Sequence, residues 1–487
     1  MGSWIQTVMK SIIVGAMAPF SFFWHDYETF GIVPRRDRPA QFAGVRTDTE
    51  LNEIEAPLTL YCRPAADMLP NPDACLITGI TPQVCAERGV AERDFADAIE
   101  AQLARPGTVG CGYNSLRFDD EVTRHLFWRN LIDPYAREWQ NDCGRWDLLD
   151  TVRCAWALRP DGIQWPTRDD GKPSLRLEHL SAANGLAHEA AHDALSDVRA
   201  TIALARLVQQ RQPKLWAHCL KLHRKQAVID EMGVGRPFAH LSGRYPVERG
   251  CMAVVWPLAP HPRFKNEVIV WDLAQDPREL FALNAKEVRE RLFTAADALP
   301  AGQARLPIKT IHLNKSPIVI GNLKTLGAAT TRWGIDLDQS LRHAEVAARQ
   351  ANSMAGIWPE VYERPPLAEA VDVDEDLYGG FLDNEDRRAL QRLRSWPPAR
   401  LAERRPAFND ARLDELVLRF RARNHPETLN ADERGRWQAH CCQRWQEAPA
   451  WVDRITALEA TADERGRGVL SELRRWEQTV RIAAGAT

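Results

Sequence analysis

The hydrophobic and polar positions divide the chain into three segments with different patterns. In the first segment, short apolar runs at 22–24, 40–47 and 58–62 are separated by prolines, which favours an antiparallel β-meander. After these runs, apolar residues recur at helical spacing, with one strand-like run at 109–113. The helical stretches begin at 82 and 119 or cover 94–103, 145–158, 175–180 and 193–211. Alternating strands and helices predict one α/β domain.

The pattern changes after Pro213. Strand-like runs punctuated by proline and glycine predict a small β-rich domain, and they lie at 253–257, 268–273, 308–312 and 318–321. Helical spacing returns at about 336, and an acidic stretch at 369–376 is expected to be a linker to a helical third at 380–484. The predicted domains are therefore 21–211, 212–366 and 367–487, preceded by a leader at 1–20 that is expected to be disordered.

The first residues need a separate interpretation. Lys10 precedes a short apolar stretch that resembles the core of a signal peptide. Cleavage there would leave an exported protein with many unpaired cysteines, so we favour a dispensable leader on a cytoplasmic protein. No later stretch reaches the ~18 apolar residues of a membrane span, so no membrane association is expected.

Composition excludes several classes of protein. A chain of 487 residues is too long for one hydrophobic core. Its net charge of −3 excludes a protein that is basic over its whole surface, so any nucleic-acid site must be a local groove. The ten cysteines contain no Cys-x-x-Cys pair, which argues against a zinc site or a disulfide framework.

Two carboxylates at the end of the first strand provide the first candidate chemistry. Asp26 and Glu28 are two positions apart, and strand residues with this spacing point to the same face. Side-by-side carboxylates repel one another unless a cation lies between them, which suggests part of a Mg²⁺ site. The same spacing recurs at 48/50 and 119/121, so this pair alone favours ordinary solvated carboxylates.

Further candidate groups complete a possible metal nuclease site. Asp119 begins a predicted helix that follows a strand, and His192 precedes Asp197 near the start of another helix. Four carboxylates and one histidine suit phosphodiester hydrolysis with two Mg²⁺ ions roughly 4 Å apart, the histidine acting as general base. His188 and Asp193 repeat the same spacing, so both histidine–aspartate pairs are candidates at this point.

Longer motifs connect these residues to a known family. The segments 25–31, 112–114 with 118–124, 145–150 and 191–194 resemble bacterial exodeoxyribonuclease I, a histidine-type member of the DEDD superfamily of 3′→5′ exonucleases. The resemblance extends from about residue 22 to the C-terminus, and it includes 38–42, 76–83 and 312–315. Matches of this length are far more specific than the short motifs of the superfamily.

The resemblance implies a fold and an activity. The expected fold is α/β: a ribonuclease H-like exonuclease domain with a mixed sheet, an SH3-like β-rich domain and an all-helical C-terminal domain, which form a C-shaped clamp. The implied activity is processive hydrolysis of single-stranded DNA from a free 3′ end to 5′-mononucleotides, in DNA repair and recombination. Two Mg²⁺ ions are implied as cofactors, for which Mn²⁺ can substitute, and a monomer is expected.

The resemblance also implies roles for individual residues. The metal-binding carboxylates of the family match Asp26, Glu28, Asp119 and Asp197. The general base matches His192, because Ala-His-Asp-Ala at 191–194 reproduces the family's motif better than the surroundings of His188 do. The residues that match groups around the DNA are Glu28, Thr29, Phe30, Arg124, Tyr135, Trp139, Arg153 and Arg176. Each arginine of this set is otherwise an ordinary surface residue, and Tyr135 and Trp139 are otherwise core aromatics.

A basic patch at 214–225 is a candidate surface for a protein partner. It contains Lys214, Lys221, Arg224 and Lys225. A known partner of the family is single-stranded DNA-binding protein, whose acidic tail has the complementary charge. His218 stands where an aromatic residue is expected in that docking region. The patch is otherwise part of the strand path or a solvated helix face.

Two alternative functions follow from the same residues. A 3′→5′ exonuclease that trims RNA or proofreads DNA would share the first domain, but it would not need the domains after Pro213. A clamp that binds DNA strands without cleaving them would be expected to have lost part of the carboxylate set, and all four positions are intact.

Overall fold

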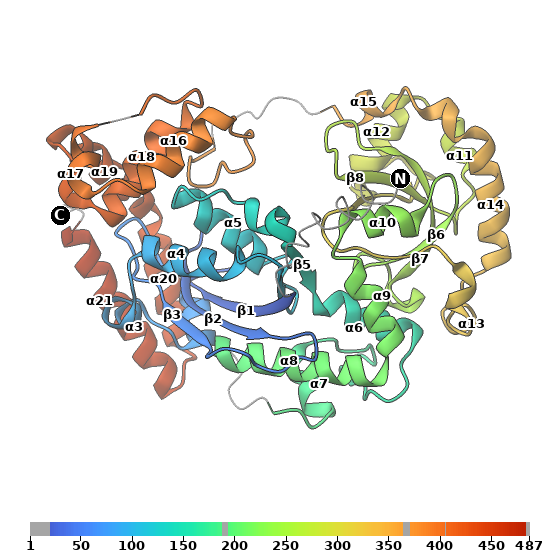
Figure 1. Ribbon diagram of the computed structural model, residues 1–487, viewed down its shortest axis with the longest axis horizontal. Coiled ribbons are helices and arrows are strands. Elements are labelled where there is room, and N and C mark those ends of the chain that lie inside the picture. Colours follow the sequence, from blue (N-terminus) through green and yellow to red (C-terminus); the bar gives the residue numbers. More distant parts are fainter. Residues whose placement is uncertain (1–19, 188–192, 364–370, 405, 484–487) are drawn as a thin grey trace, which may run out of the picture.

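The computed structural model describes residues 20–187, 193–363, 371–404 and 406–483. The predicted leader at 1–20 lies outside these ranges except for Phe20. The exonuclease-like α/β part forms the base of the molecule, the helical C-terminal part rises on one side and the β-rich part on the other (Figure 1). No helix within the described ranges is both long and apolar enough to cross a membrane.

The first sheet is mixed, as predicted, and has the strand order β3-β2-β1-β4-β5. Strands β1 (Ser21–Thr29), β2 (Pro39–Thr47) and β3 (Leu58–Tyr61) form the predicted antiparallel meander. Strand β4 (Thr108–Gly112) then pairs with β1 in parallel. The carboxyl ends of β1 and β4 therefore lie at the same edge of the sheet, where the first candidate carboxylates are found.

Helices cover both faces of this sheet, which explains why β1 and β2 are buried on both sides. On one face, Phe23 packs with α4 (Glu92–Leu103) and α5 (Asp119–Arg129). On the other face, Trp24 packs with α6 (Leu148–Leu158) and α8 (Ala194–Arg211). Three shorter helices complete this domain, namely α2 (Pro72–Thr78), α3 (Pro82–Arg88) and α7 (Leu177–Ala183).

The prediction of one helix over 145–158 is wrong at its beginning. Residues Gly144–Asp147 form strand β5, which pairs with β4 in parallel, and α6 begins only at Leu148. The Asp147 carboxylate accepts a hydrogen bond from the Leu149 backbone N–H at 2.9 Å and so caps the helix. Trp146 is buried in the strand and Leu148 in the helix. The apolar residues continue across the boundary between β5 and α6, so the pattern does not show where the strand ends and the helix begins.

The second sheet is antiparallel throughout, with the order β10-β6-β7-β8-β9. Its strands are β6 (Phe238–Leu241), β7 (Met252–Pro260), β8 (Glu267–Asp272), β9 (Ile308–His312) and β10 (Ile318–Ile320). The four predicted strands are present, whereas β6 was not predicted because its four residues are too few for a clear alternation. The helices of this part are α9 (Pro213–Lys221), α10 (Lys225–Met232), α11 (Arg278–Phe281), α12 (Ala285–Phe293), α13 (Ala329–Arg332), α14 (Leu337–Gln350) and α15 (Trp358–Val361).

The C-terminal part is helical, as predicted, and is docked on the first domain. Its helices are α16 (Asn384–Arg394), α17 (Pro398–Glu403), α18 (Arg412–Asn424), α19 (Ala431–Arg444), α20 (Ala448–Glu459) and α21 (Glu464–Ala483). Trp451 of α20 joins a buried cluster with Phe30 and Cys75 of the first domain. Its indole N–H also donates a hydrogen bond to the Pro70 carbonyl at 2.6 Å.

The acidic stretch predicted as a linker is a structural part of the C-terminal domain where it is described. Asp374 is only 4% exposed and receives hydrogen bonds from Arg419 and Arg423. Both arginines extend from α18. A buried carboxylate is stable when cations and hydrogen bonds compensate its charge. The acidic residues therefore attach this segment to α18 and do not make it a solvent-exposed linker. The residues at 364–370 lie outside the described ranges.

Candidate metal centre and substrate groove

Three predicted metal-binding carboxylates lie together at the end of β1. Asp26 and Glu28 project from the same face of the strand, and Asp197 comes from the first turn of α8. One ligand oxygen from each of the three lies within 4.8 Å of the others. The alternation of β1 and the packing of α8 against β1 and β2 produce this arrangement.

The fourth predicted carboxylate, Asp119, approaches the same strand from α5. It is the first residue of that helix and is 3% exposed. The backbone N–H of Tyr27, between Asp26 and Glu28, donates a hydrogen bond to Asp119 Oδ1 at 3.2 Å. Because β4 runs parallel to β1, the turn after β4 delivers α5 to the edge where Asp26 lies.

The carboxylates raise one another's pKa values. Burial raises the pKa of Asp26 well above its usual range, and the charges of Asp119, Glu28 and Asp197 raise it further. Burial and the charges of Asp197, Asp119 and Asp193 raise the pKa of Glu28 to about 8. These carboxyl groups would be ionised at neutral pH in water, but here they hold their protons unless a bound cation compensates the negative charge. Hard oxygen ligands at this spacing fit a divalent ion such as Mg²⁺.

The two candidate histidine–aspartate pairs are only partly described. His192 and His188 both lie outside the described residues. Asp193 caps α8, where its carboxylate accepts from the Ser196 N–H at 3.2 Å and from the Gln41 side-chain amide at 3.3 Å. Asp197, one turn further on, is the aspartate whose oxygen approaches Asp26 and Glu28.

Three of the predicted substrate-contacting residues have partners inside the protein. Arg124 is 4% exposed, and its guanidinium donates to Glu138 at 2.7 Å and to Glu121 at 2.8 Å. Arg153 is 6% exposed and pairs with Asp150. Phe30 belongs to the buried cluster shared with the C-terminal domain.

Of the other predicted contacts, Trp139 and Arg176 lie at the surface, Tyr135 is half-buried and Thr29 is buried. Trp139 is 67% exposed, and Arg176 is exposed with its guanidinium 3.9 Å from Glu178. Tyr135 is half-buried below the Arg124 guanidinium, 5.3 Å from its ring centroid. Thr29 donates its hydroxyl to the Gly31 carbonyl at 2.6 Å. Trp139 and Arg176 are therefore accessible to a ligand without rearrangement.

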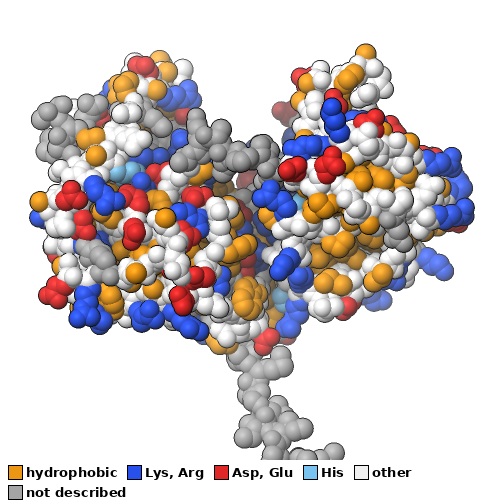
Figure 2. All heavy atoms as spheres, turned by 90° about the horizontal axis from the view of Figure 1, so that it is seen from above, with side chains coloured by type: hydrophobic (Ala, Val, Ile, Leu, Met, Phe, Trp, Pro, Cys, Tyr) orange, Lys and Arg blue, Asp and Glu red, His pale blue; other side chains and the backbone are white. Residues whose placement is uncertain are grey.

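A groove of about 890 Å³ separates the first domain from the β-rich domain. Its basic lining residues are Arg117, Arg244, Arg305, Lys309 and Lys315, and its aromatic ones are Phe293 and Tyr362. Figure 2 shows the hollow between the two lobes from above, with Lys and Arg side chains beside it. Cations suit the phosphates of an unpaired strand, and aromatic rings suit its bases.

The Glu121 carboxylate, at the edge of this groove, joins all three domains. It receives hydrogen bonds from Lys315 of the β-rich domain at 3.3 Å and from the Tyr378 hydroxyl of the C-terminal domain. Arg124 donates both to Glu121 and to the Tyr378 hydroxyl, the latter at 3.0 Å. Sequence reasoning did not identify this junction, because its members are separated by about 190 and 60 positions and no local pattern links them.

Family models match nearly the whole chain. Residues 23–205 match the model described as "Exonuclease", 223–364 the "Exonuclease I SH3-like domain" and 371–480 the "Exonuclease I C-terminal domain". The chain belongs to the exonuclease I family. The family and fold expected from the sequence motifs are thereby confirmed.

Characterised relatives are similar along most of their length. Exodeoxyribonuclease I of Escherichia coli is 44% identical over 423 residues, which cover 86% of this chain and 89% of the relative. The Haemophilus influenzae enzyme is 42% identical, over 86% of this chain and 90% of the relative. The predicted enzyme class, an exodeoxyribonuclease, is confirmed, and the family implies dependence on a divalent metal ion.

Solved structures agree with the three-domain arrangement. Exonuclease I from Methylocaldum szegediense is 49% identical with a TM-score of 0.89, over 95% of this chain and 99% of that structure. E. coli Exonuclease I in complex with a dA16 oligonucleotide is 41% identical with a TM-score of 0.90, over 95% and 100%. A further structure of the E. coli protein is described as the zinc-bound form of its complex with single-stranded DNA.

Proposed function

We propose that this exodeoxyribonuclease degrades single-stranded DNA from the 3′ end to 5′-mononucleotides with two Mg²⁺ ions. The observation that carries this proposal is the group formed by Asp26, Glu28 and Asp197, whose ligand oxygens lie within 4.8 Å of one another. Asp119 is the fourth ligand of the proposed site. Bound Mg²⁺ would activate water and stabilise the leaving oxygen.

The chain's own residues provide the remaining parts of the proposed reaction. The four carboxylates hold the charge that a divalent cation needs, and the raised pKa values of Asp26, Glu28 and Asp119 mean that cation binding releases protons. We propose His192 as the general base that takes the proton of the attacking water, because an imidazole titrates near neutral pH. Asp193, as the cap of α8, fixes the beginning of the helix that carries Asp197.

The lining of the groove favours single-stranded DNA over a duplex as the substrate. Its basic residues lie on two domains, and Phe293 and Tyr362 offer faces on which unpaired bases can stack. The similar E. coli protein has been solved with oligonucleotides. We propose that the strand follows this groove to the carboxylates and contacts the exposed Trp139 and Arg176. Arg124 and Arg153, which are paired internally, would contact it only after exchanging partners.

The proposed substrate and cofactor are tested together. A 5′-labelled single strand, its duplex and the matching RNA are incubated with Mg²⁺ or with chelator and sampled over time. The expected result is Mg²⁺-dependent shortening of the single strand from its 3′ end, with duplex and RNA resistant. RNA cut as readily as DNA would support the trimming alternative, and binding without cleavage would contradict the proposal.

A substitution tests the assignment of the metal-binding aspartate. Asp197→Ala should abolish cleavage and leave strand binding largely intact, because the groove and not the carboxylate provides affinity. Asp193→Ala is the matched comparison, since it removes a helix cap worth about 1 kcal/mol and leaves the proposed ligands in place. A fully active Asp197→Ala variant would exclude Asp197 as a ligand and make His188 with Asp193 the candidate pair.

The basic patch supports a protein partner. All four cations are exposed, but Lys221 pairs with Glu231 at 2.8 Å and Lys225 bonds to Asn266 at 2.6 Å, whereas Lys214 and Arg224 form no ion pair with any residue that the structure describes. We propose that Lys214 and Arg224 meet the acidic tail of single-stranded DNA-binding protein. Binding of a tail peptide should weaken in Lys214→Glu, and unchanged affinity would contradict this contact.

We further propose that the protein is a monomer, to be tested by light scattering, and that it is cytoplasmic, to be tested by cell fractionation.

A further inference from the structure

The sheet holds the end of strand β1, which carries Glu28, less firmly than the rest of the strand. The register of β1 against β2 shifts between Glu28 and Thr29, and a shift of this kind disrupts the hydrogen-bond ladder locally. On the other side of β1, the pairs with β4 run from Ser21 to Trp24 and stop before the carboxylates. Asp26 and Glu28 also repel each other when no cation lies between them. Their positions therefore depend in part on contacts outside the sheet.

One such contact joins the end of β1 to the beginning of α2. The carbonyl of Phe30, two residues after Glu28, accepts a hydrogen bond from the Asn71 N–H at 2.7 Å. Asn71 is the N-cap of α2, and its side-chain oxygen accepts from the Asp73 and Ala74 N–H groups at 2.8 and 3.2 Å. The backbone at Asn71 is thus fixed by the helix, and it holds the residues that follow Glu28.

Trp451 of the C-terminal domain holds the same segment. Its indole N–H donates a hydrogen bond to the carbonyl of Pro70, the residue before Asn71, at 2.6 Å. Trp451 is 8% exposed and Phe30 is 2% exposed, and both belong to one buried cluster. A buried carbonyl that loses its donor is costly, because water does not replace the bond. Trp451 therefore reaches the end of β1 through two successive hydrogen bonds and through apolar packing.

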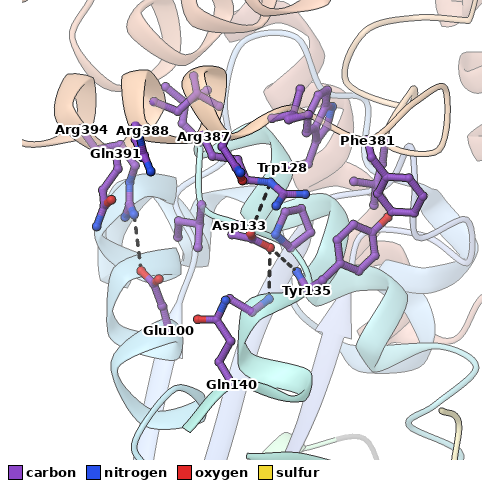
Figure 3. A pocket seen from close by; sticks show the side chains of 18 of the residues that line it. Glu100, Trp128, Asp133, Tyr135, Gln140, Phe381, Arg387, Arg388, Gln391 and Arg394 are labelled. Carbon is purple, nitrogen blue, oxygen red and sulfur yellow. Dashed lines mark hydrogen bonds and ion pairs between the residues drawn. The ribbon is translucent and has the colours of Figure 1, made fainter. Parts of the chain in front are cut away.

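The C-terminal domain is also docked at places away from the end of β1. Figure 3 shows one of them, where Arg394 of α16 reaches Glu100 of α4 at 3.4 Å. At another, the Trp445 indole N–H donates to the Ala66 carbonyl at 3.0 Å. The buried cluster around Trp445 is formed by residues of α19, α21 and the segment before α2. Trp445 therefore makes the same kind of bond as Trp451 to the same segment, but away from the residue that contacts the end of β1.

We propose that Trp451 is a positioning residue for the metal centre, and that it holds Glu28 in place through the segment that contacts Phe30. This inference rests on the proposed function, because it concerns the residues proposed to bind Mg²⁺. When the end of β1 is loosened, repulsion drives Glu28 away from Asp26, and bringing the two carboxylates back together takes free energy from cation binding. Groups that orient metal ligands from behind typically affect metal affinity in this way.

The test compares three variants of the full-length protein. Trp451→Phe keeps an aromatic ring in the cluster and removes the indole N–H. Trp445→Phe, the matched control, removes the same donor from the other docking contact. Ile455→Val removes one methyl group from the cluster that contains Phe30, where Ile455 is fully buried. The loss of one methyl group rarely unfolds a protein, so this variant serves if Trp451→Phe does not fold.

Three measurements follow the metal centre. Binding of Mn²⁺ is measured by calorimetry without DNA, digestion of single-stranded DNA is measured against the Mg²⁺ concentration, and hydrogen exchange is measured without metal over 28–38 and 66–75. Trp451→Phe should weaken Mn²⁺ binding, and raise the Mg²⁺ concentration for half-maximal digestion, by about tenfold, the lower end of the range for lost orienting groups. Exchange in both segments should become faster. Ile455→Val should weaken metal binding by about twofold.

The control separates positioning from docking in general. Trp445→Phe should lose a similar amount of stability in urea, because it loses the same kind of bond, but it should keep the metal affinity of the wild type and slow exchange at 28–38. Binding of an oligonucleotide in chelator should be unchanged in all three variants, because the groove provides that affinity. A merely structural role of Trp451 would lower stability in both tryptophan variants and change metal binding in neither.

Equal Mn²⁺ affinities of the two tryptophan variants would overturn the proposal. If Trp451→Phe does not fold, a wild-type Mn²⁺ affinity of Ile455→Val overturns it in the same way. The proposed function is judged by the wild type alone, through Mg²⁺-dependent digestion of single-stranded DNA. A wild type that digests DNA while the tryptophan variants bind Mn²⁺ equally loses only the positioning role. A wild type that does not digest DNA, but whose Mn²⁺ affinity falls in Trp451→Phe and not in Trp445→Phe, loses only the proposed function.

Discussion

Replacing Glu28 with glutamine measures how much the buried, mutually repelling carboxylates lower the free energy of unfolding. Glu28 is 8% exposed, and burial together with its acidic neighbours raises its pKa from the ordinary 4.5 to about 8. Glutamine preserves the size of the side chain and removes its charge. In the absence of a bound cation, the substitution should therefore stabilise the folded protein at high pH.

The sign and size follow from proton linkage. An acid with a raised pKa holds its proton more tightly in the folded state, so its contribution is fully present below pH 4.5 and is lost as the pH rises through 8. Relative to low pH, the raised pKa of Glu28 lowers the free energy of unfolding by roughly 1 kcal/mol at pH 5 and by about 4–5 kcal/mol at pH 9. The advantage of Glu28→Gln over the wild type should grow by roughly 4 kcal/mol across this window.

Urea unfolding in chelator at pH 5, 7 and 9 checks this expectation. Glu87→Gln, an exposed carboxylate on α3, is the control and should change stability equally at every pH. Added Mg²⁺ should stabilise the wild type at pH 9 and reduce the advantage of Glu28→Gln, because only the wild type retains the complete ligand set. An advantage that is the same at pH 5 and pH 9 would refute the reasoning.

Two further predictions concern packing and domain docking. Asp67→Asn should lower the free energy of unfolding by about 3–5 kcal/mol in urea, because it removes one of the two carboxylates that compensate the buried Arg38 and Arg423 guanidinium groups, which lie 3.0 and 2.7 Å from Asp67 and retain Asp374. An effect below about 1 kcal/mol, the value of a surface pair, would contradict this. Gly44→Ala should lower the thermal midpoint, since its new Cβ would lie 2.3 Å from the Phe23 ring, and overpacking of this kind costs about 1–3 kcal/mol. An unchanged midpoint would show that the ring can move.

The residues that could be predicted are those whose position depends on local periodicity. Asp26 and Glu28 share a face because β1 is a strand, and Asp119 begins a helix because turn residues follow β4. The motif around residues 191–197 then identified Asp197 as a member of the group. Each of these placements needs only a strand, a helix start and the order of the strands in one sheet.

The partners of the arginines could not be predicted in this way. Arg124 and Arg153 are predicted to contact DNA from the resemblance alone, yet each is paired with a carboxylate of its own domain. A guanidinium binds a phosphate or a carboxylate with the same geometry, so the sequence alone does not distinguish the two. The same limit applies to Glu121, whose bonds to Lys315 and Tyr378 depend on how three domains meet.

Compensation of charge, more than the spacing of ligands, distinguishes the proposed metal site from a structural cluster. Asp67 and Asp374, with His440, also bring oxygen and nitrogen ligands within 4.8 Å of one another. Burial acts to raise the pKa of Asp67, but the Arg423 guanidinium beside it holds that pKa well below its usual range. Around Asp26 and Glu28 the neighbouring charges are other carboxylates, which raise the pKa further. The cluster around Asp67 and Asp374 is compensated by arginine side chains, whereas the cluster around Asp26 and Glu28 needs a cation from solution.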